Sequence, residues 1–194
     1  MTHEETNLKT KQMLATSLKQ HMTKKPLNKI TVTEIIQDCN INRKTFYYHF
    51  ENIYALLKWM LEQEAINVVK NYDLAVDYKD AILFVMEYVE ANTYILNCAY
   101  NSMGREEMKR FFYADFVDIT QNIICNIEQE LNIHVSEHFK NVLCDLYTEA
   151  IAGLLINCFK CKEKINKERM LNYVSLMIYT GLPAILKEAA NQSL

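Results

Sequence analysis

The chain has 194 residues, of which 50% are hydrophobic and 23% charged, and it contains only three Gly and two Pro. Three glycines are too few for a Gly-rich phosphate-binding loop, and they disfavour the many tight turns of β-proteins. We therefore predict an all-α fold. The net charge of −3 is unevenly distributed, because residues 1–50 carry eight Lys/Arg against four Asp/Glu while the remainder is acidic. This asymmetry favours an anionic partner at the N-terminal end.

The first residues are acidic and lack the apolar segment of a signal peptide, and uninterrupted apolar runs are much shorter than the roughly 20 residues of a membrane span. We therefore expect a cytoplasmic protein. Its six cysteines should be reduced there.

A first helix is predicted from a cap at Thr6 or Asn7 to about Thr23. Its apolar residues recur every four positions and should form a buried stripe. They are Leu14, Leu18 and Met22.

A short second helix is predicted over Val32–Cys39, because Thr31 and Glu34 have the spacing of a capping box. Asn40 follows, and Asn tolerates the left-handed backbone conformation that ends many helices.

A third short helix is predicted from Arg43 to about Phe50, with Asn42 as its cap. Phe46 and Phe50 lie four residues apart and should anchor it to the core. Two short helices joined by a brief turn are typical of a helix-turn-helix.

The outward face of this segment is rich in hydrogen-bond donors and has no acidic residue between Asp38 and Glu51. Such a face suits contacts to DNA phosphates and base edges. The candidate DNA-binding residues are Thr31, Thr33, Asn42, Arg43, Lys44, Thr45, Tyr47, Tyr48 and His49.

Longer helices are predicted for the rest of the chain, with Pro183 kinking or bending the last one. Their expected ranges are 53–70, 78–91, 93–100, 105–132, 136–161 and 167–190.

The segment from Ile30 to Leu57 resembles the DNA-binding domain of the TetR/AcrR family of bacterial transcription regulators. The matching residues are Ile30-Thr31-Val32, Ile35-Ile36, Cys39-Asn40-Ile41, Arg43, Thr45-Phe46-Tyr47, His49-Phe50 and Ala55-Leu56-Leu57. The chain departs from the family at Ile53, where a phosphate-contacting Lys is common. Residues 59–62 also resemble the subgroup typified by regulators of dihydroxyacetone kinase operons.

The resemblance implies a helix-turn-helix DNA-binding domain over residues 1–52 and a helical regulatory and dimerisation domain over 53–194. It implies a homodimer on a palindromic operator, with DNA affinity controlled by an effector in the C-terminal domain. The alternative is a regulator switched by a partner protein, with no small-molecule pocket.

Two residue sets are candidates within the second domain. The candidate ligand-pocket residues are Trp59, Tyr88, Tyr94, Tyr100, Met103, Phe112, Phe116 and Tyr147. The candidate dimer-interface residues are Leu146, Ala150, Gly153, Leu154, Tyr173, Met177, Gly181 and Ile185.

An enzyme is not expected, and neither is a cofactor or a metal. No histidine follows a glutamate at the Glu-x-x-His spacing of a di-iron bundle. The pair Cys158 and Cys161 has the CxxC spacing but lacks a second pair to complete tetrahedral zinc coordination.

Overall fold

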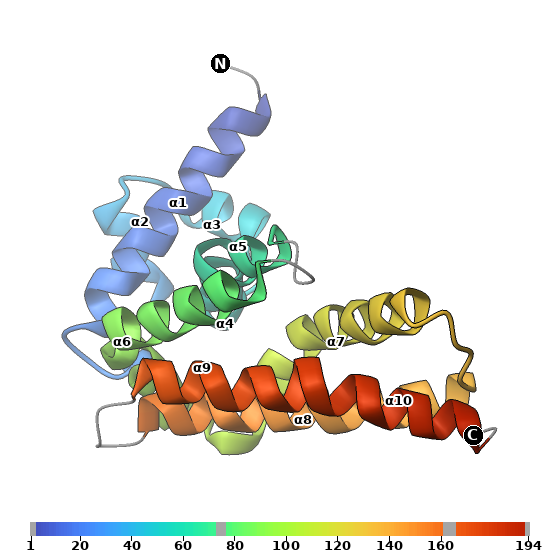
Figure 1. Ribbon diagram of the computed structural model, residues 1–194. Helices are drawn as coiled ribbons and strands as arrows, with labels where there is room; N and C mark the ends of the chain where they lie inside the picture. The colour runs from blue at the N-terminus through green and yellow to red at the C-terminus, as the bar shows by residue number, and fades with distance from the viewer. Residues whose placement is uncertain (1–2, 73–76, 161–165, 193–194) are drawn as a thin grey trace. The chain divides into compact units, whose positions relative to one another are not determined.

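The computed structural model describes residues 3–72, 77–160 and 166–192, and its regular elements are all helices (Figure 1). This part of the chain contains no strand, and the predicted all-α fold is confirmed. The elements are α1 (His3–Met22), η1 (Leu27–Lys29), α2 (Val32–Asp38), α3 (Arg43–His49), α4 (Ile53–Leu61), η2 (Glu62–Ile66), α5 (Asn67–Lys70), α6 (Tyr78–Met103), α7 (Arg105–Glu130), α8 (Glu137–Lys160), α9 (Lys167–Ser175), η3 (Leu176–Gly181) and α10 (Leu182–Asn191).

The chain divides into two compact units. Unit 1 comprises Met1–Val68 and Asn92–Gly104, and unit 2 comprises Val69–Ala91 and Arg105–Leu194. Unit 1 extends past residue 52, where the sequence places the end of the DNA-binding domain, because α4 packs against α1. The apolar residues of α4 therefore complete the core of the helix-turn-helix.

The core of unit 1 forms where α1, α2 and α4 present apolar side chains to one another. The predicted stripe of Leu14, Leu18 and Met22 is fully buried, and Ile35 and Leu56 are buried with it. The helix itself begins at His3, so Thr6 and Asn7 lie within its first turns and do not cap it. Acidic residues at positions 4 and 5 favour this earlier start, because they complement the positive end of the helix dipole.

The turn between α2 and α3 has the predicted local chemistry. Thr31 and Glu34 form a reciprocal capping box, and the Asn42 side chain accepts a hydrogen bond from the Thr45 backbone N–H at 2.8 Å. Asn40 has φ of 51°, so the left-handed residue predicted there is present. Outside the turn, Asp38 accepts hydrogen bonds from Ser17 and His21 and thereby links α2 to α1.

Helix α6 runs through the predicted break near residue 92. Asn92 has non-helical angles, φ −112° and ψ 15°, so the helix is kinked where the sequence predicts two separate helices. The predicted helix over 53–70 is likewise present but widens into the π-helical turn η2.

In unit 2, α7 and α8 form a hairpin whose apolar side chains pack with α10. The Glu128 carboxylate closes the hairpin by accepting hydrogen bonds from the Val135 N–H and the Lys140 ammonium, both at 2.9 Å. The pKa of the Glu128 carboxyl is lowered, and the largest cause is the hydrogen bond from the Val135 backbone N–H. Asn132, with φ of 50°, makes the left-handed turn.

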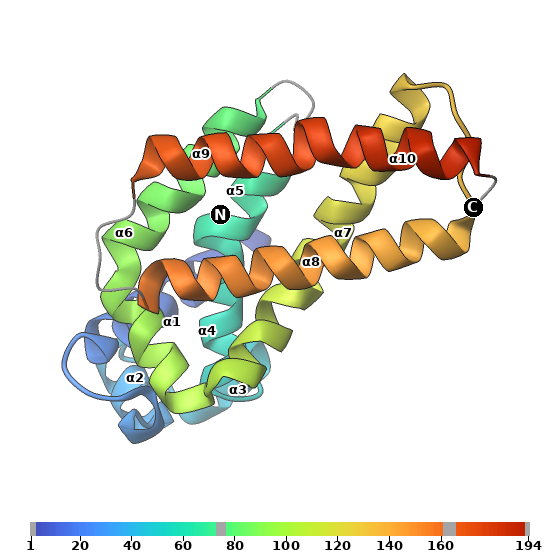
Figure 2. The same cartoon turned by 60° about the horizontal axis from the view of Figure 1, so that its bottom comes forward.

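The α8 helix and the run α9–η3–α10 run in opposite directions (Figures 1 and 2). The irregularity predicted at Pro183 lies just before it, where the Leu182 N–H donates to the Met177 carbonyl in a π-helical turn.

Among the described helices, α8 is long and apolar enough to span a bilayer by length and composition alone. One such helix is weak evidence, because core helices of soluble proteins pass the same test. The buried residues Leu143 and Cys144 of α8 belong to the unit 2 core.

The left-handed backbone at Asn40 gives a stability prediction. Asn40→Ala should lower the free energy of unfolding by about 1 kcal/mol, because a Cβ-bearing residue without a locally bonding side chain is strained there. Asn40→Gly should be neutral or stabilising, since Gly has no such strain. Urea unfolding of the two variants checks this, and equal stability of both would contradict it.

Glu34 makes the stability of unit 1 depend on pH. Hydrogen bonds from Lys25 and from Thr31 lower the pKa of this carboxyl from 4.5 to about 2. The stabilisation is complete above pH 4.5 and is lost as the pH falls towards 2, because the unfolded chain then binds a proton more readily than the native one.

Glu34→Gln should therefore lower the melting temperature at pH 7 and reduce its change between pH 5 and pH 2 (about the range of the titration). The matched control is Glu51→Gln, at an exposed glutamate of the same unit. A Glu34→Gln acid profile parallel to that of the wild type would rule out the role of this pair.

Candidate functional site

The short helix α3 is held in place by aromatic packing on one side. Phe46 is fully buried and Phe50 is 6% exposed, and their ring centroids lie 6.2 Å apart. Phe50 also packs against Trp59 of α4 at 5.8 Å. The Lys11 ammonium of α1 lies 5.7 Å from the Trp59 ring centroid, which adds a cation–π contact. Two helices, α1 and α4, therefore help to position α3.

The opposite side of α3 is open to solvent. Tyr48 is 69% exposed and Tyr47 is 49% exposed, while Arg43 and Lys44 are also exposed. The Arg43 guanidinium lies 5.8 Å from the Tyr47 ring centroid, so this aromatic ring supports the charged side chain. These side chains present donors on a short, rigid helix.

Other members of the candidate DNA-binding set take part in helix capping. Thr31 donates to the Glu34 carboxylate at 2.8 Å, and the Thr45 hydroxyl donates to Asn42 Oδ1 at 3.1 Å. Thr33 is exposed next to this cap. The caps fix where α2 and α3 begin and thereby determine the direction of the α3 donors.

His49 is half-buried, and its ring lies 5.0 Å from that of Tyr48. Burial, with a smaller effect of the nearby Lys11 charge, lowers the pKa of His49. At neutral pH the imidazole is therefore mainly uncharged, and it offers a hydrogen bond more than a positive charge.

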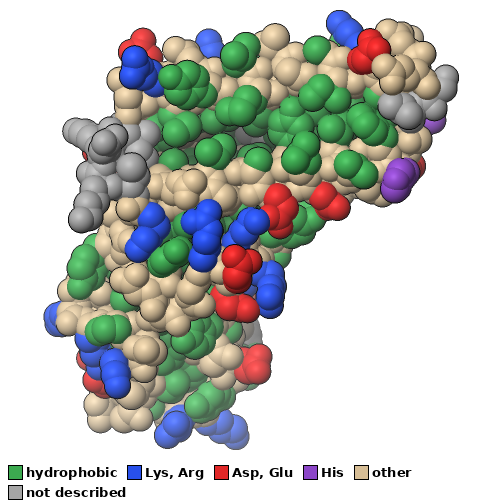
Figure 3. Space-filling view, turned by 90° about the horizontal axis from the view of Figure 1, so that it is seen from below, with side chains coloured by type: hydrophobic (Ala, Val, Ile, Leu, Met, Phe, Trp, Pro, Cys, Tyr) green, Lys and Arg blue, Asp and Glu red, His purple; other side chains and the backbone are tan. Residues whose placement is uncertain are grey.

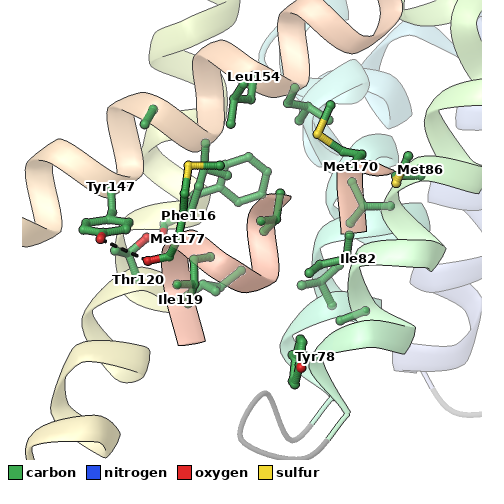
Figure 4. Close-up of a pocket in the computed structure, with 18 of the residues that line it drawn as sticks. Tyr78, Ile82, Met86, Phe116, Ile119, Thr120, Tyr147, Leu154, Met170 and Met177 are labelled. Atoms are coloured by element: carbon green, nitrogen blue, oxygen red, sulfur yellow. Dashed lines mark hydrogen bonds between the residues drawn. The ribbon is translucent and has the colours of Figure 1, made fainter. Parts of the chain in front are cut away.

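Unit 2 contains a cavity of about 220 Å³ (Figure 4). Its wall is formed by residues of α5, α6, α7 and α8 together with α9 and η3. The labelled side chains include Ile82 and Met86 on one side and Leu154 and Met177 on others, around a common space.

Phe116 and Tyr147 of the predicted pocket set line this cavity. The other predicted residues do not. Trp59 packs on Phe50 in unit 1, and Tyr94 is 59% exposed there. Tyr100 and Met103 also belong to unit 1, while Tyr88 packs against Phe84 and Phe112 stacks on Phe116 in unit 2. Whether an aromatic side chain lines the cavity or packs in the core depends on how the helices contact one another. The spacing of residues along one helix does not distinguish the two cases.

Sequence reasoning missed the wall residues of α6. Tyr78, Ile82, Val85 and Met86 lie along one side of this helix and line the cavity. Their spacing of three to four residues marks an apolar helix face, which is the only signal in the sequence and is equally typical of a filled core.

An apolar strip of unit 2 remains on the surface of α8 and the run α9–η3–α10 (Figure 3). Leu146, Leu154, Tyr173, Met177 and Ile185 of the predicted dimer set are exposed on it. Ala150 is also exposed, and Gly153 and Gly181 are partly buried. Ala150, Leu154 and Met177 line the cavity as well, so the strip and the cavity share part of their wall.

No cluster of three or more His, Cys, Asp or Glu suited to a metal occurs among the described residues. Cys158 lies on the cavity wall, and Cys161 of the CxxC pair lies outside the described residues.

The chain is similar to known transcription regulators in both sequence and fold. A TetR-type family model, described as the C-terminal region of transcriptional regulators, matches residues 77–180. A curated relative, the HTH-type dhaKLM operon transcriptional activator DhaS of Lactococcus lactis subsp. lactis (strain IL1403), is 22% identical over 145 residues, which cover 75% of this chain and 76% of the relative.

A solved structure named dihydroxyacetone kinase operon activator DhaS matches with a TM-score of 0.67 at 20% identity, covering 93% of this chain and 98% of that one. Both relatives agree with the subgroup resemblance in the sequence. The family model spans more than half of the chain and matches outside the helix-turn-helix that carried the resemblance. The chain therefore belongs to the TetR family of transcriptional regulators.

Proposed function

We propose that this chain is a cytoplasmic, homodimeric regulator that binds a specific DNA operator and whose operator affinity is controlled by an effector in unit 2. The exposed donor face of α3 is the observation that carries the proposal, because Arg43, Lys44, Tyr47 and Tyr48 share one rigid, acid-free surface. The Lactococcus lactis relative is named a transcriptional activator of an operon, which supports the same class of action.

In this mechanism α3 enters the DNA major groove, which is wide enough for a helix and presents a different donor and acceptor pattern for each base pair. Arg43, Lys44, Thr45 and Tyr48 contact base edges. Thr33, Asn42, Tyr47 and His49 contact mainly phosphates and set the register of the helix. Thr31 contributes through the cap that fixes the start of α2.

A homodimer would present two α3 helices to half-sites about one DNA turn apart, roughly 34–36 Å. The exposed apolar strip of unit 2 supports this assembly, because large exposed apolar patches on soluble proteins usually mark interfaces. Gly153 gives independent support. A Cβ built there meets no atom within 4 Å, so packing inside one protomer does not require glycine at this position.

An effector site in unit 2 is supported by the cavity of about 220 Å³. The alternative, a regulator switched by a partner protein without a pocket, would be favoured by a filled core. An effector changes operator affinity only if it binds one conformation of the dimer better than the other.

The role of α3 is tested with DNA selected from a random pool by the wild-type protein. Arg43→Ala should weaken binding of the selected fragment by about 1–3 kcal/mol, roughly 5- to 150-fold, if Arg43 forms a bidentate contact with guanine. Tyr47→Phe should also weaken binding, because it removes a donor to phosphate. Fluorescence anisotropy at constant salt measures both variants.

Lys187→Ala, at an exposed lysine of α10, is the control and should bind like the wild type. Unchanged affinity of both Arg43→Ala and Tyr47→Phe would refute the assignment of α3. If Lys187→Ala weakened binding as much as Arg43→Ala does, the effect of Arg43 would be only a general charge effect.

The dimer interface is tested at Gly153. Gly153→Arg should give a folded monomer that has lost operator binding, because the protomer has room for the side chain but a close apolar interface does not. Gly153→Ala should remain dimeric and gain up to about 1 kcal/mol of stability from its higher helix propensity. Sedimentation velocity measures the oligomeric state. A dimeric Gly153→Arg variant would place the interface elsewhere.

A further inference from the structure

We propose that the cavity of unit 2 takes one uncharged, mainly apolar molecule. The inference deepens the proposed function by naming the chemical class of the effector. Binding itself depends only on unit 2 and not on DNA, so the two proposals can fail separately.

Among the described residues, none with a charged side chain lines the cavity. Aliphatic residues and methionines such as Ile82, Ile119, Leu155, Met86 and Met170 dominate it. A charged ligand would lose its hydration on entering this space and find no ion partner on the wall, which opposes binding. An apolar ligand has no such penalty and gains from the removal of its surface from water.

Two hydroxyl groups on the wall already donate hydrogen bonds within the protein. The Thr120 hydroxyl donates to the Phe116 carbonyl at 3.0 Å, and the Tyr147 hydroxyl donates to the Met177 carbonyl at 3.3 Å (Figure 4). Each hydroxyl proton is thus engaged and is not available to a ligand. Neither of these two hydroxyls therefore offers a proton that would compensate a carboxylate for its lost hydration.

The volume limits the ligand to a small molecule. A protein cavity of about 150 Å³ binds benzene, and this one measures about 220 Å³. A molecule of roughly nine non-hydrogen atoms is the corresponding size by proportion. Met86, Met170 and Met177 supply flexible side chains that can adapt to its shape.

The wall also reaches the surface. Leu154 is 37% exposed and Met177 is 47% exposed, and both line the cavity. In a single protomer the cavity therefore opens on the same strip that is proposed as the dimer interface.

The test compares 1-octanol with octanoate, which share the alkyl chain but differ in charge and in the ability to donate. Full-length protein carrying ¹³C-methyl methionine is titrated with each probe and followed by NMR. 1-Octanol should shift the methyl signals of Met86, Met170 and Met177 saturably. Octanoate should bind at least about tenfold more weakly. The exposed Met13 of unit 1 reports non-specific binding and should not shift.

A space-filling variant and a matched control locate the site. Val174→Phe places a larger side chain on the cavity wall and should abolish the 1-octanol shifts. Val142→Phe makes the same change at an exposed position of α8 that does not line the cavity, and it should bind 1-octanol normally. The comparison of the two probes on wild-type protein needs no variant, so it stands if Val174→Phe does not fold.

Three results would overturn the proposal: octanoate binding as tightly as 1-octanol, shifts that include Met13 equally, or no saturable shift at all. Binding of the selected DNA fragment is measured on the same protein without any probe. DNA binding with no 1-octanol binding refutes only the ligand class. 1-Octanol binding without DNA binding refutes the proposed function and leaves the ligand class intact.

Discussion

Burial of Phe46 and Phe50 is the interaction on which the DNA-binding face depends. These rings pin a helix of seven residues, which is too short to be stable alone in water, against α1 and α4. With that side buried, the residues between them must point outwards. The exposure of Arg43, Tyr47 and Tyr48 is thus a direct consequence of the aromatic packing.

Polar contacts give this small unit its accuracy. The capping box at Thr31 and Glu34 and the Asn42 cap satisfy backbone N–H groups that a helix start otherwise leaves unpaired. Ion pairs then connect elements distant in sequence, as Lys25 does with Glu34 and Lys19 with Glu64. Apolar burial supplies most of the stabilisation, whereas these contacts determine where each helix begins.

Unit 2 uses its apolar residues differently. Part of them forms a filled core around Ile124, Leu143 and Leu186. Another part lines a cavity, and a third part stays exposed on α8 and the run α9–η3–α10. Met177 and Leu154 belong to both the cavity wall and the exposed strip. Ligand and second protomer would therefore act on the same side chains, which is a short physical route for coupling them.

The sequence by itself determined the helical class, the caps at Thr31 and Asn42, the left-handed Asn40 and the buried stripe of α1, because each depends on residues a few positions apart. It also indicated the family, since caps, core and polar face occur in one register. Only the tertiary structure decided that Trp59 supports α3 and that α6 lines the cavity. A cavity is the space left between several helices, and the periodicity of each helix is the same whether that space is filled or empty.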